Sequence, residues 1–296
     1  MKQNAEQTEK KIILVGNPNV GKSVLFNALT GAYTTVSNYP GTSVEVSRGH
    51  CDLDGIRYEV LDTPGMYSLL PITEEERVAR EILLTEEPHV VLHVVDARNL
   101  ERMLPMTMQL IEAGLPVVLV VNILDEAKRL GMELDLAKLQ QRLNVPVIGA
   151  VMRRRQGLEE LRHALSPAPV TQQGAAYDSV LEAAIGRITD TLNGSYRLDK
   201  RALALLLMQR DEEVAALVGK IEGENTVAVE ETVRTVIFEK RSDLNLQISL
   251  ERKRFCREAV DGVVQQKVLN GLPWSERLSR WTMKPATGIP ILLLVL

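Results

Sequence analysis

The first half of the chain alternates short apolar runs with stretches in which apolar residues recur every three or four positions. The runs are rich in β-branched residues, which is typical of buried parallel strands, and the stretches between them predict helices. This alternation predicts a doubly wound, mostly parallel α/β domain over residues 11–166. The predicted strands are 12–15, 90–95, 117–121 and 145–148, and the predicted helices are 74–84, 103–113, 134–143 and 158–165.

One pair of strands breaks the parallel pattern. Residues 44–53 and 56–61 flank Asp54-Gly55, a dipeptide that is typical of a tight hairpin turn. We therefore expect one antiparallel edge strand in an otherwise parallel sheet.

The alternation ends at Ser166-Pro167-Ala168-Pro169, which predicts a linker. Helical spacing of apolar residues continues over 177–192, 201–209, 228–240 and 244–268. We expect a smaller, all-helical domain over 170–268, and a disordered N-terminus over residues 1–10, which are polar.

Residues 272–296 change character again. Trp274 and Trp281 lie among basic residues, and the uncharged, almost wholly apolar run 288–296 follows. Nine residues are too few for a membrane span, which needs about 20. The run is either the start of a first transmembrane helix that this chain does not complete, or an ordinary C-terminal core element.

Composition restricts the function classes. The chain has 296 residues, 45% hydrophobic and 25% charged, with a net charge of −4, so it is globular and lacks the basic footprint of a nucleic-acid binder. Its two cysteines, Cys51 and Cys256, form neither a disulfide framework nor a zinc pattern, which favours a reducing cytosolic setting.

The first chemical motif is Gly16-Asn17-Pro18-Asn19-Val20-Gly21-Lys22-Ser23. It fits the phosphate-binding loop G-x-x-x-x-G-K-[ST], and a predicted strand precedes it and a helix follows. The glycines let backbone N–H groups wrap around phosphate oxygens at a helix start. Lys22 supplies positive charge to the β- and γ-phosphates, and the Ser23 hydroxyl is a candidate Mg²⁺ ligand.

Two later motifs choose the nucleotide. Asp62-Thr63-Pro64-Gly65 follows a predicted strand; Asp62 can hold Mg²⁺ through a water, and the Gly65 N–H can sense a γ-phosphate. Asn122-Ile123-Leu124-Asp125 follows another strand. The Asp125 carboxylate can accept the N1–H and N2–H of guanine, donors that adenine lacks, and Asn122 braces the loop. The order of the motifs predicts a GTP/GDP site.

The loop from Ser37 to Glu45 is the expected first switch, which needs one hydroxyl to reach Mg²⁺ when a γ-phosphate is present. Thr42 and Ser43 both qualify, and Gly41 precedes them in the predicted nucleotide contact.

These motifs carry a specific resemblance. GNPNVGKS, NYPG-x-[ST]-VE, DTPGMYSL and N-x-x-DEA resemble the small GTPases of the TRAFAC class and, within it, the N-terminal cytosolic domain of the FeoB family of bacterial ferrous iron transporters. The segment 170–268 is similar to the helical domain of that family, which stabilises bound GDP, and 272–296 is similar to the approach to its first membrane helix.

The resemblance implies roles for individual residues. Lys22 and the loop amides hold phosphates, Ser23 and Ser43 ligate Mg²⁺, Asp62 lies in the second shell of that ion, and Asn122 and Asp125 read guanine. Asn19 would ligate K⁺ together with the carbonyls of Ser37 and Tyr39, and the cation would offset charge that develops during hydrolysis. The implied catalytic residues are therefore Asn19, Lys22 and Gly65; the alternative for Asn19 is a turn residue.

Three departures from the family pattern matter. Serine stands at position 43 where threonine is usual, and Val151-Met152, followed by Arg153, replaces the usual Ser-Ala of the last guanine element. Only the Met152 N–H would then meet guanine O6. Asp62-Thr63-Pro64-Gly65 is the second switch motif of this resemblance, and Met66 follows it where other GTPases place a glutamine. Slow hydrolysis is therefore expected.

The leading hypothesis is a K⁺-stimulated GTPase on the cytoplasmic side of the inner membrane. It would regulate Fe²⁺ uptake through its own C-terminal membrane domain, with small accessory proteins of the transport system and a homo-oligomer as possible partners and no nucleic acid. The alternatives are a soluble Era-like GTPase in ribosome or RNA function, and a nucleotide sensor that does not hydrolyse GTP.

Overall fold

The structure is a computed structural model that describes residues 10–31, 34–53, 55–165, 176–240 and 243–267. The expected linker 166–169 and the expected membrane approach 272–296 lie outside these residues, as does the expected disordered terminus except Lys10, which begins the first strand. Within the described ranges, no helix combines the length and the apolar character that a membrane crossing requires.

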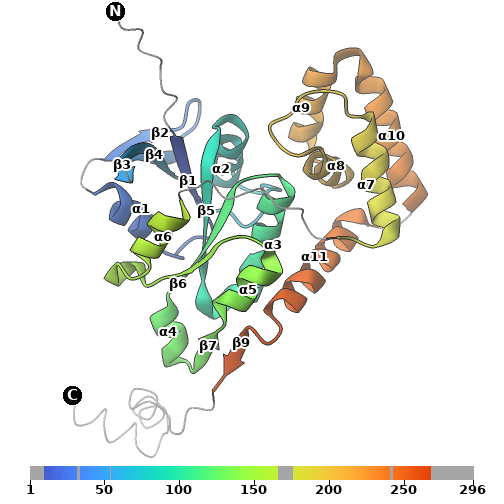
Figure 1. Cartoon of the computed structure of the whole chain (residues 1–296). Coiled ribbons are helices and arrows are strands. Elements are labelled where there is room, and N and C mark those ends of the chain that lie inside the picture. Colours follow the sequence, from blue (N-terminus) through green and yellow to red (C-terminus); the bar gives the residue numbers. More distant parts are fainter. Residues whose placement is uncertain (1–9, 32–33, 54, 166–175, 241–242, 268–296) are drawn as a thin grey trace, which may run out of the picture.

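A seven-stranded sheet forms the centre of the first unit (Figure 1). Its order is β2-β3-β4-β1-β5-β6-β8, and every pairing is parallel except the two that β3 makes. The doubly wound prediction is therefore confirmed. The strands are β1 Lys10–Val15, β2 Thr34–Asn38, β3 Glu45–Leu53, β4 Ile56–Asp62, β5 Pro88–Asp96, β6 Val117–Asn122 and β8 Val147–Gly149.

Helices cover both faces of this sheet. Helices α1 and α6 lie on one face, whereas α2 and α3 lie on the other, between the sheet and the second unit (Figure 1). The bounds are α1 Lys22–Thr30, α2 Glu74–Thr85, α3 Leu100–Glu112, α4 Leu124–Arg129, α5 Leu136–Leu143 and α6 Leu158–Ala164.

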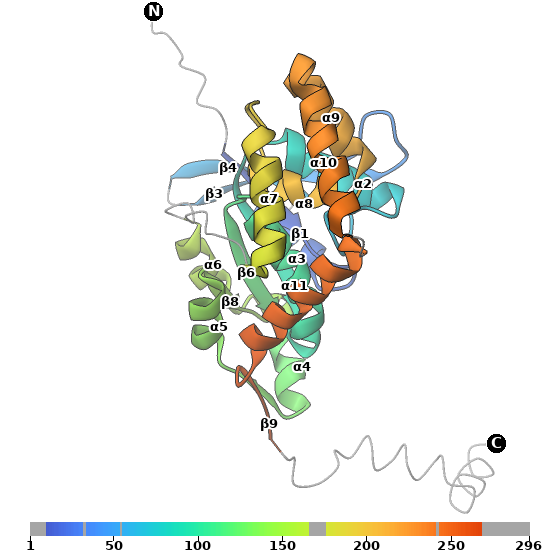
Figure 2. The ribbon, with the colours of Figure 1, turned by 90° about the vertical axis from the view of Figure 1, so that its right-hand side faces the viewer.

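Four helices of the second unit, all but α10 (Thr226–Lys240), begin at an aspartate. The side chains of Asp178, Asp199, Asp211 and Asp243 each accept a hydrogen bond from a backbone N–H in the first turn of the helix that follows. The helices are α7 Ser179–Thr191, α8 Lys200–Met208, α9 Glu212–Glu222, α10 Thr226–Lys240 and α11 Leu244–Val260. The last of them runs back along α3 and α5 toward the sheet (Figure 2).

Two expectations are wrong, one about a strand and one about a helix. The antiparallel strand β3 is not at the edge, because β2 pairs with it on its outer side and includes Ser37, which was expected in a loop. The helix expected over 244–268 ends at Val260. After Gly262, which has φ +62, the chain forms β9 (Val264–Gln266), paired with β7 (Met132–Leu134) of the first unit. The second unit is therefore not followed by further helix within the described residues.

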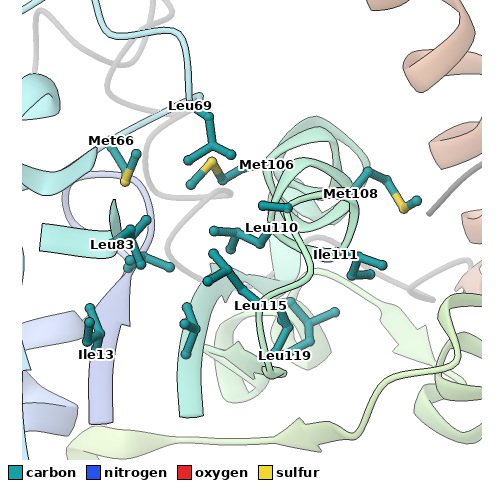
Figure 3. Close-up of a cluster of buried hydrophobic side chains, with 14 of the residues drawn as sticks. Ile13, Met66, Leu69, Leu83, Met106, Met108, Leu110, Ile111, Leu115 and Leu119 are labelled. Atoms are coloured by element: carbon teal, nitrogen blue, oxygen red, sulfur yellow. The ribbon is translucent and has the colours of Figure 1, made fainter. Parts of the chain in front are cut away.

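A single apolar core joins the sheet to α2 and α3. Met66 and Leu69, from the loop between β4 and α2, are 0% and 4% exposed. Figure 3 shows them beside Met106 of α3 and Leu83 of α2. This loop is therefore anchored in the core through its own side chains, although it carries no regular structure before α2.

Buried polar contacts fasten the two units together. Glu112 at the end of α3 is 2% exposed and pairs with Arg252 of α11 at 2.7 Å. The Tyr177 hydroxyl donates to the other oxygen of the same carboxylate at 2.6 Å. Charges buried this deeply persist only when paired, so this cluster fixes α7 and α11 against α3.

His93 is an ionisable group enclosed in the sheet. It is 0% exposed, and its Nδ1 lies 2.9 Å from the Thr107 hydroxyl. Burial, with a smaller effect from the Lys22 charge, lowers the pKa of His93 to about 3. The imidazole is therefore neutral in the folded protein throughout the physiological range.

We expect acid to destabilise the fold through His93. The unfolded chain binds a proton near pH 6.5 and the folded chain only near pH 3, so stability is full above pH 6.5 and falls as the pH drops toward 3. Between pH 7 and pH 5 this group alone should lower the free energy of unfolding by about 2 kcal/mol. Urea unfolding at both pH values measures it, and His93→Met should remove that share of the difference. An unchanged difference in the variant would contradict the assignment.

Candidate functional site

The motif from Gly16 to Ser23 joins β1 to α1 at the carboxyl end of the sheet, and its last two residues, Lys22 and Ser23, begin α1. Two of its glycines are required by close packing. A Cβ on Gly16, which has φ +144, would lie 2.3 Å from the Val94 carbonyl oxygen, and one on Gly21, with φ +94, would lie 2.4 Å from the Asn122 amide nitrogen. The loop is therefore held against both β5 and β6.

Lys22 turns back over this loop. Its ammonium donates to the carbonyls of Gly16 at 3.0 Å and Asn17 at 3.3 Å, and the residue is 8% exposed. Burial lowers the pKa of Lys22, whereas the nearby Asp62 carboxylate raises it. The amine is thus centred above the loop, where an anion would lie.

Ser23 and Asp62 meet beside Lys22. Burial raises the pKa of Asp62, although a hydrogen bond from the Ser23 side chain opposes that shift. The Asp62 Oδ1 atom is buried and has no hydrogen-bond partner within the described part of the chain. A hydroxyl beside a carboxylate oxygen with unused acceptor capacity is a donor set that fits Mg²⁺.

The second switch motif is fastened to the phosphate loop. The Met66 N–H donates to the Gly16 carbonyl at 3.1 Å, and the Thr63 hydroxyl donates to the Leu14 carbonyl at 2.7 Å. A Cβ on Gly65 would lie 2.7 Å from the Pro18 ring. The Thr63 hydroxyl is thus bonded to the backbone of β1 and does not face the site. Gly65, in contrast, packs directly against the phosphate loop.

Asn122 joins three segments. Its amide donates to the Val20 carbonyl at 2.9 Å, and its carbonyl oxygen accepts from the Met152 N–H at 3.0 Å. The expected bracing contact of Asn122 is therefore present. The expectation that the Met152 N–H is available for guanine O6 is not met in this conformation, because that N–H is already bonded; Val151 beside it is buried.

Asp125 faces the arginines of the next loop. Its side chain is 13% exposed, and its Oδ2 lies 3.2 Å from Arg153 and 3.9 Å from Arg154. Ile123 holds a left-handed φ of 64°, which is uncommon for a β-branched residue, and Leu124 follows as the first residue of α4. The strained position starts the helix so that the carboxylate points toward the 150–155 loop.

The first switch is closed on itself at the edge of the sheet. The Tyr39 N–H donates to the Val44 carbonyl at 2.8 Å, and the Thr42 hydroxyl donates to the Tyr39 carbonyl at 3.0 Å. Thr42 is therefore engaged inside the turn at Gly41, whereas Ser43 is exposed.

The expected K⁺ ligands are not assembled in this structure. Ser37 lies in β2, three strand positions from β1, or about 14 Å away at the usual strand spacing. The Tyr39 carbonyl accepts hydrogen bonds from the N–H and the hydroxyl of Thr42. The side chain of Tyr39 is hydrogen-bonded to Thr85 at the end of α2. Asn19 is exposed at φ 64° on the phosphate loop.

Residues that sequence reasoning missed hold the loop between Gly65 and Thr73. Glu76 accepts from the N–H groups of Tyr67 and Ile72, at 3.1 and 2.8 Å, and forms a capping box with Thr73. The spacing Thr-x-x-Glu could have revealed that cap. Gln109 and Arg80, which also bind this loop, have no local signal, because they act across elements that only the fold brings together.

Two protein-family models match the chain. Residues 10–165 match the model described as Ferrous iron transport protein B, and residues 177–265 match the FeoB cytosolic helical domain. The chain belongs to the FeoB family.

Named FeoB proteins resemble it at moderate identity. A Fe(2+) transport protein A/Fe(2+) transporter FeoB fusion protein of Porphyromonas gingivalis is 37% identical over 221 residues, which are 71% of this chain and 26% of that protein. The Fe(2+) transporter FeoB of Escherichia coli O157:H7 is 39% identical over 156 residues, 51% of this chain and 20% of that protein. The chain thus spans about a quarter or less of these relatives.

Solved FeoB structures share the fold over most of the chain. A variant of S. thermophilus NFeoB bound to GDP has a TM-score of 0.77 and 33% identity, covering 86% of this chain and all of that one. The cytosolic domain of the T. maritima FeoB iron transporter in its GMPPNP form has a TM-score of 0.74 and 27% identity, covering 87% of this chain and all of that one.

We expect Asn122→Ala to loosen the site without unfolding it. The change removes two buried hydrogen bonds worth about 1 kcal/mol each, so the free energy of unfolding should fall by about 2 kcal/mol. Urea unfolding measures the loss. Asn27→Ala, on an exposed part of α1, is the matched control and should change it by less than about 0.5 kcal/mol. Equal effects of the two changes would refute the bracing role.

Proposed function

We propose that this chain binds GTP and GDP with Mg²⁺ and hydrolyses GTP slowly. The observation that carries the proposal is the meeting of three motifs at one edge of the sheet. The phosphate loop follows β1, Asp62 ends β4 and the Asn122–Asp125 segment starts at the last residue of β6; Asn122 is also hydrogen-bonded to the phosphate loop. Ligands bind outside the carboxyl ends of strands in such sheets, where the strand order reverses. The GDP named for the S. thermophilus relatives supports this assignment.

The base is read by Asp125. Its carboxylate accepts two hydrogen bonds from guanine and none from adenine, so adenine would leave a partly buried charge without partners. Arg153 holds this carboxylate in the structure, and its exposed side chain must give way when the base enters. The contacts proposed for the base also include Ile123, Leu124 and Val151, and the Met152 N–H would reach guanine O6 only by leaving the Asn122 side-chain oxygen.

Asp125→Asn should exchange base preference. The amide replaces one acceptor by a donor, so GDP affinity should fall on the order of 100-fold. Xanthosine diphosphate, which has a carbonyl where guanine has its amino group, should bind the variant better than GDP does. Titration calorimetry measures both. Glu126→Gln, on the same helix but paired with Arg98, is the control and should leave GDP affinity unchanged. A variant that keeps full GDP affinity would refute the base assignment.

Hydrolysis relies on the phosphate loop and both switches. Lys22 and the loop N–H groups hold the phosphates, and the Ser23 hydroxyl together with Asp62 would hold Mg²⁺, which neutralises charge on the phosphates when bound. Ser43 is the proposed first-switch ligand, since the Thr42 hydroxyl is spent inside its own turn. The first switch must therefore leave the turn at Tyr39 and Val44 to bring Ser43 to the metal. The Gly65 N–H faces the γ-phosphate.

Asn19, with the carbonyls of Ser37 and Tyr39, is proposed to hold a K⁺ ion that offsets developing charge. Met66 is buried and offers no polar group to orient water, which makes such help necessary. We expect phosphate release from GTP to be about tenfold faster in KCl than in NaCl, and Asn19→Ala to abolish the difference while GDP still binds. Asn27→Ala should keep it. Stimulation that survives in Asn19→Ala would refute the cation site, and turnover absent from both salts would favour the non-hydrolysing sensor.

In its biological setting the GTPase is proposed to regulate Fe²⁺ uptake. Full-length relatives named Fe(2+) transporters support a membrane domain as its partner and an inner-membrane location with this portion on the cytoplasmic side. Accessory proteins and a homo-oligomer remain proposals. The Era-like alternative loses its support because the helical segment matches the FeoB helical domain.

A further inference from the structure

The loop between β4 and α2, residues 65–73, is held at both backbone groups of one residue. The Leu69 N–H donates to the side-chain oxygen of Gln109 on α3 at 2.6 Å, and the Leu69 carbonyl accepts from the guanidinium of Arg80 on α2 at 3.2 Å. Leu69 is itself buried beside Met106 (Figure 3). The position of this loop therefore depends on where the Arg80 guanidinium lies.

Arg80 is shared between this loop and the second unit. The residue is 2% exposed, and its guanidinium forms ion pairs with Asp211 and Glu213 besides its bond to Leu69. A planar guanidinium offers several donors in a fixed fork, so one group can hold a carbonyl and two carboxylates at once. If one of these acceptors moves and the guanidinium follows it, the hydrogen bonds of Arg80 to the other two acceptors must change.

Asp211 links Arg80 to helix α9. One carboxylate oxygen accepts from the Val214 N–H at 2.9 Å and caps the helix, while the other pairs with Arg80. Only Val214 and Val218 of α9 are buried. Besides the Asp211 cap, little packing therefore stabilises this helix. Its stability is therefore sensitive to the state of one side chain.

We propose that Arg80 is a positioning residue that couples the second switch loop to α9, so that each biases the conformation of the other. The coupling rests on the proposed function in one respect, that a γ-phosphate moves this loop. The coupling is reciprocal: whatever displaces Leu69 loosens the start of α9, and whatever displaces Asp211 loosens the loop. Helix α9 also forms one wall of an open groove of about 900 Å³ against α10, and Asp211 lies in its lining.

Hydrogen exchange tests the coupling without any nucleotide. Asp211→Asn keeps a good helix cap but removes the charge that holds Arg80. In the nucleotide-free full chain, amides of residues 66–72 should then exchange about tenfold faster, although the change lies in the other unit. Arg80→Lys, which keeps the charge but not the fork, should act in the same direction. Unchanged exchange of the loop in both variants would overturn the proposal.

Two controls separate coupling from general loosening. Arg77→Gln removes an exposed ion pair to the same Glu213 at 2.9 Å and leaves the Arg77 backbone bond to the Thr73 carbonyl in place. Tyr177→Phe weakens a different buried contact between the units, at Glu112. Neither should accelerate exchange of residues 66–72. Acceleration by Tyr177→Phe equal to that of Asp211→Asn would overturn the proposal, because any loosening would then suffice.

A nucleotide arm separates this inference from the proposed function. Exchange over residues 212–222 should differ between GDP and a non-hydrolysable GTP analogue in the unaltered chain, and Arg80→Lys should reduce that difference at least threefold. If the unaltered chain binds neither nucleotide, the proposed function fails, while the nucleotide-free comparison still decides the coupling. If it binds both and 212–222 exchange identically, the coupling does not carry the nucleotide state and the inference fails.

Discussion

The amide of Asn122 is the contact on which the geometry of the site depends. It ties the Val20 carbonyl of the phosphate loop to the Met152 N–H of the last guanine loop, and it begins the segment that carries Asp125. Because this amide lies 4% exposed at the end of β6, neither bond competes with water. The distance between the phosphate and base subsites is thereby set by one side chain rather than by three separate loops.

Among the contacts between the two units, two buried ion-pair clusters differ in character. Glu112, Arg252 and Tyr177 form a closed cluster that touches no loop of the site, whereas Arg80 and Asp211 form a cluster that does. Removing one partner from either leaves a buried charge, so both are costly to break. The Glu112 cluster therefore fixes the second unit to α3. The Arg80 cluster, in contrast, joins the second unit directly to the 65–73 loop.

The sequence predicted what local patterns encode. The loop at Gly16, the aspartate after β4 and the asparagine after β6 are visible because each motif is contiguous and follows an apolar run. Strand β2 was missed because all five of its residues are exposed, so it has no alternation to detect, and β9 because its three residues pair only with a strand 130 positions earlier in the chain. Arg80 and Gln109 looked like ordinary helix residues, since their partners lie on other elements. The occupied Met152 N–H likewise depends on Asn122, far away in sequence.

The pairing of β9 with β7 decides how the chain leaves this part of the molecule. Lys267, the last described residue, donates its N–H to the Gly131 carbonyl at 2.7 Å, and Gly131 lies two residues after the end of α4, the helix that bears Asp125. A pull on Lys267 would therefore act on the segment that follows α4 as well as on α11, because both are joined to β9. A mechanical load on this strand pair would therefore enter the site from the side of Asp125, whereas Gly65 lies on the side of the phosphate loop, against Pro18.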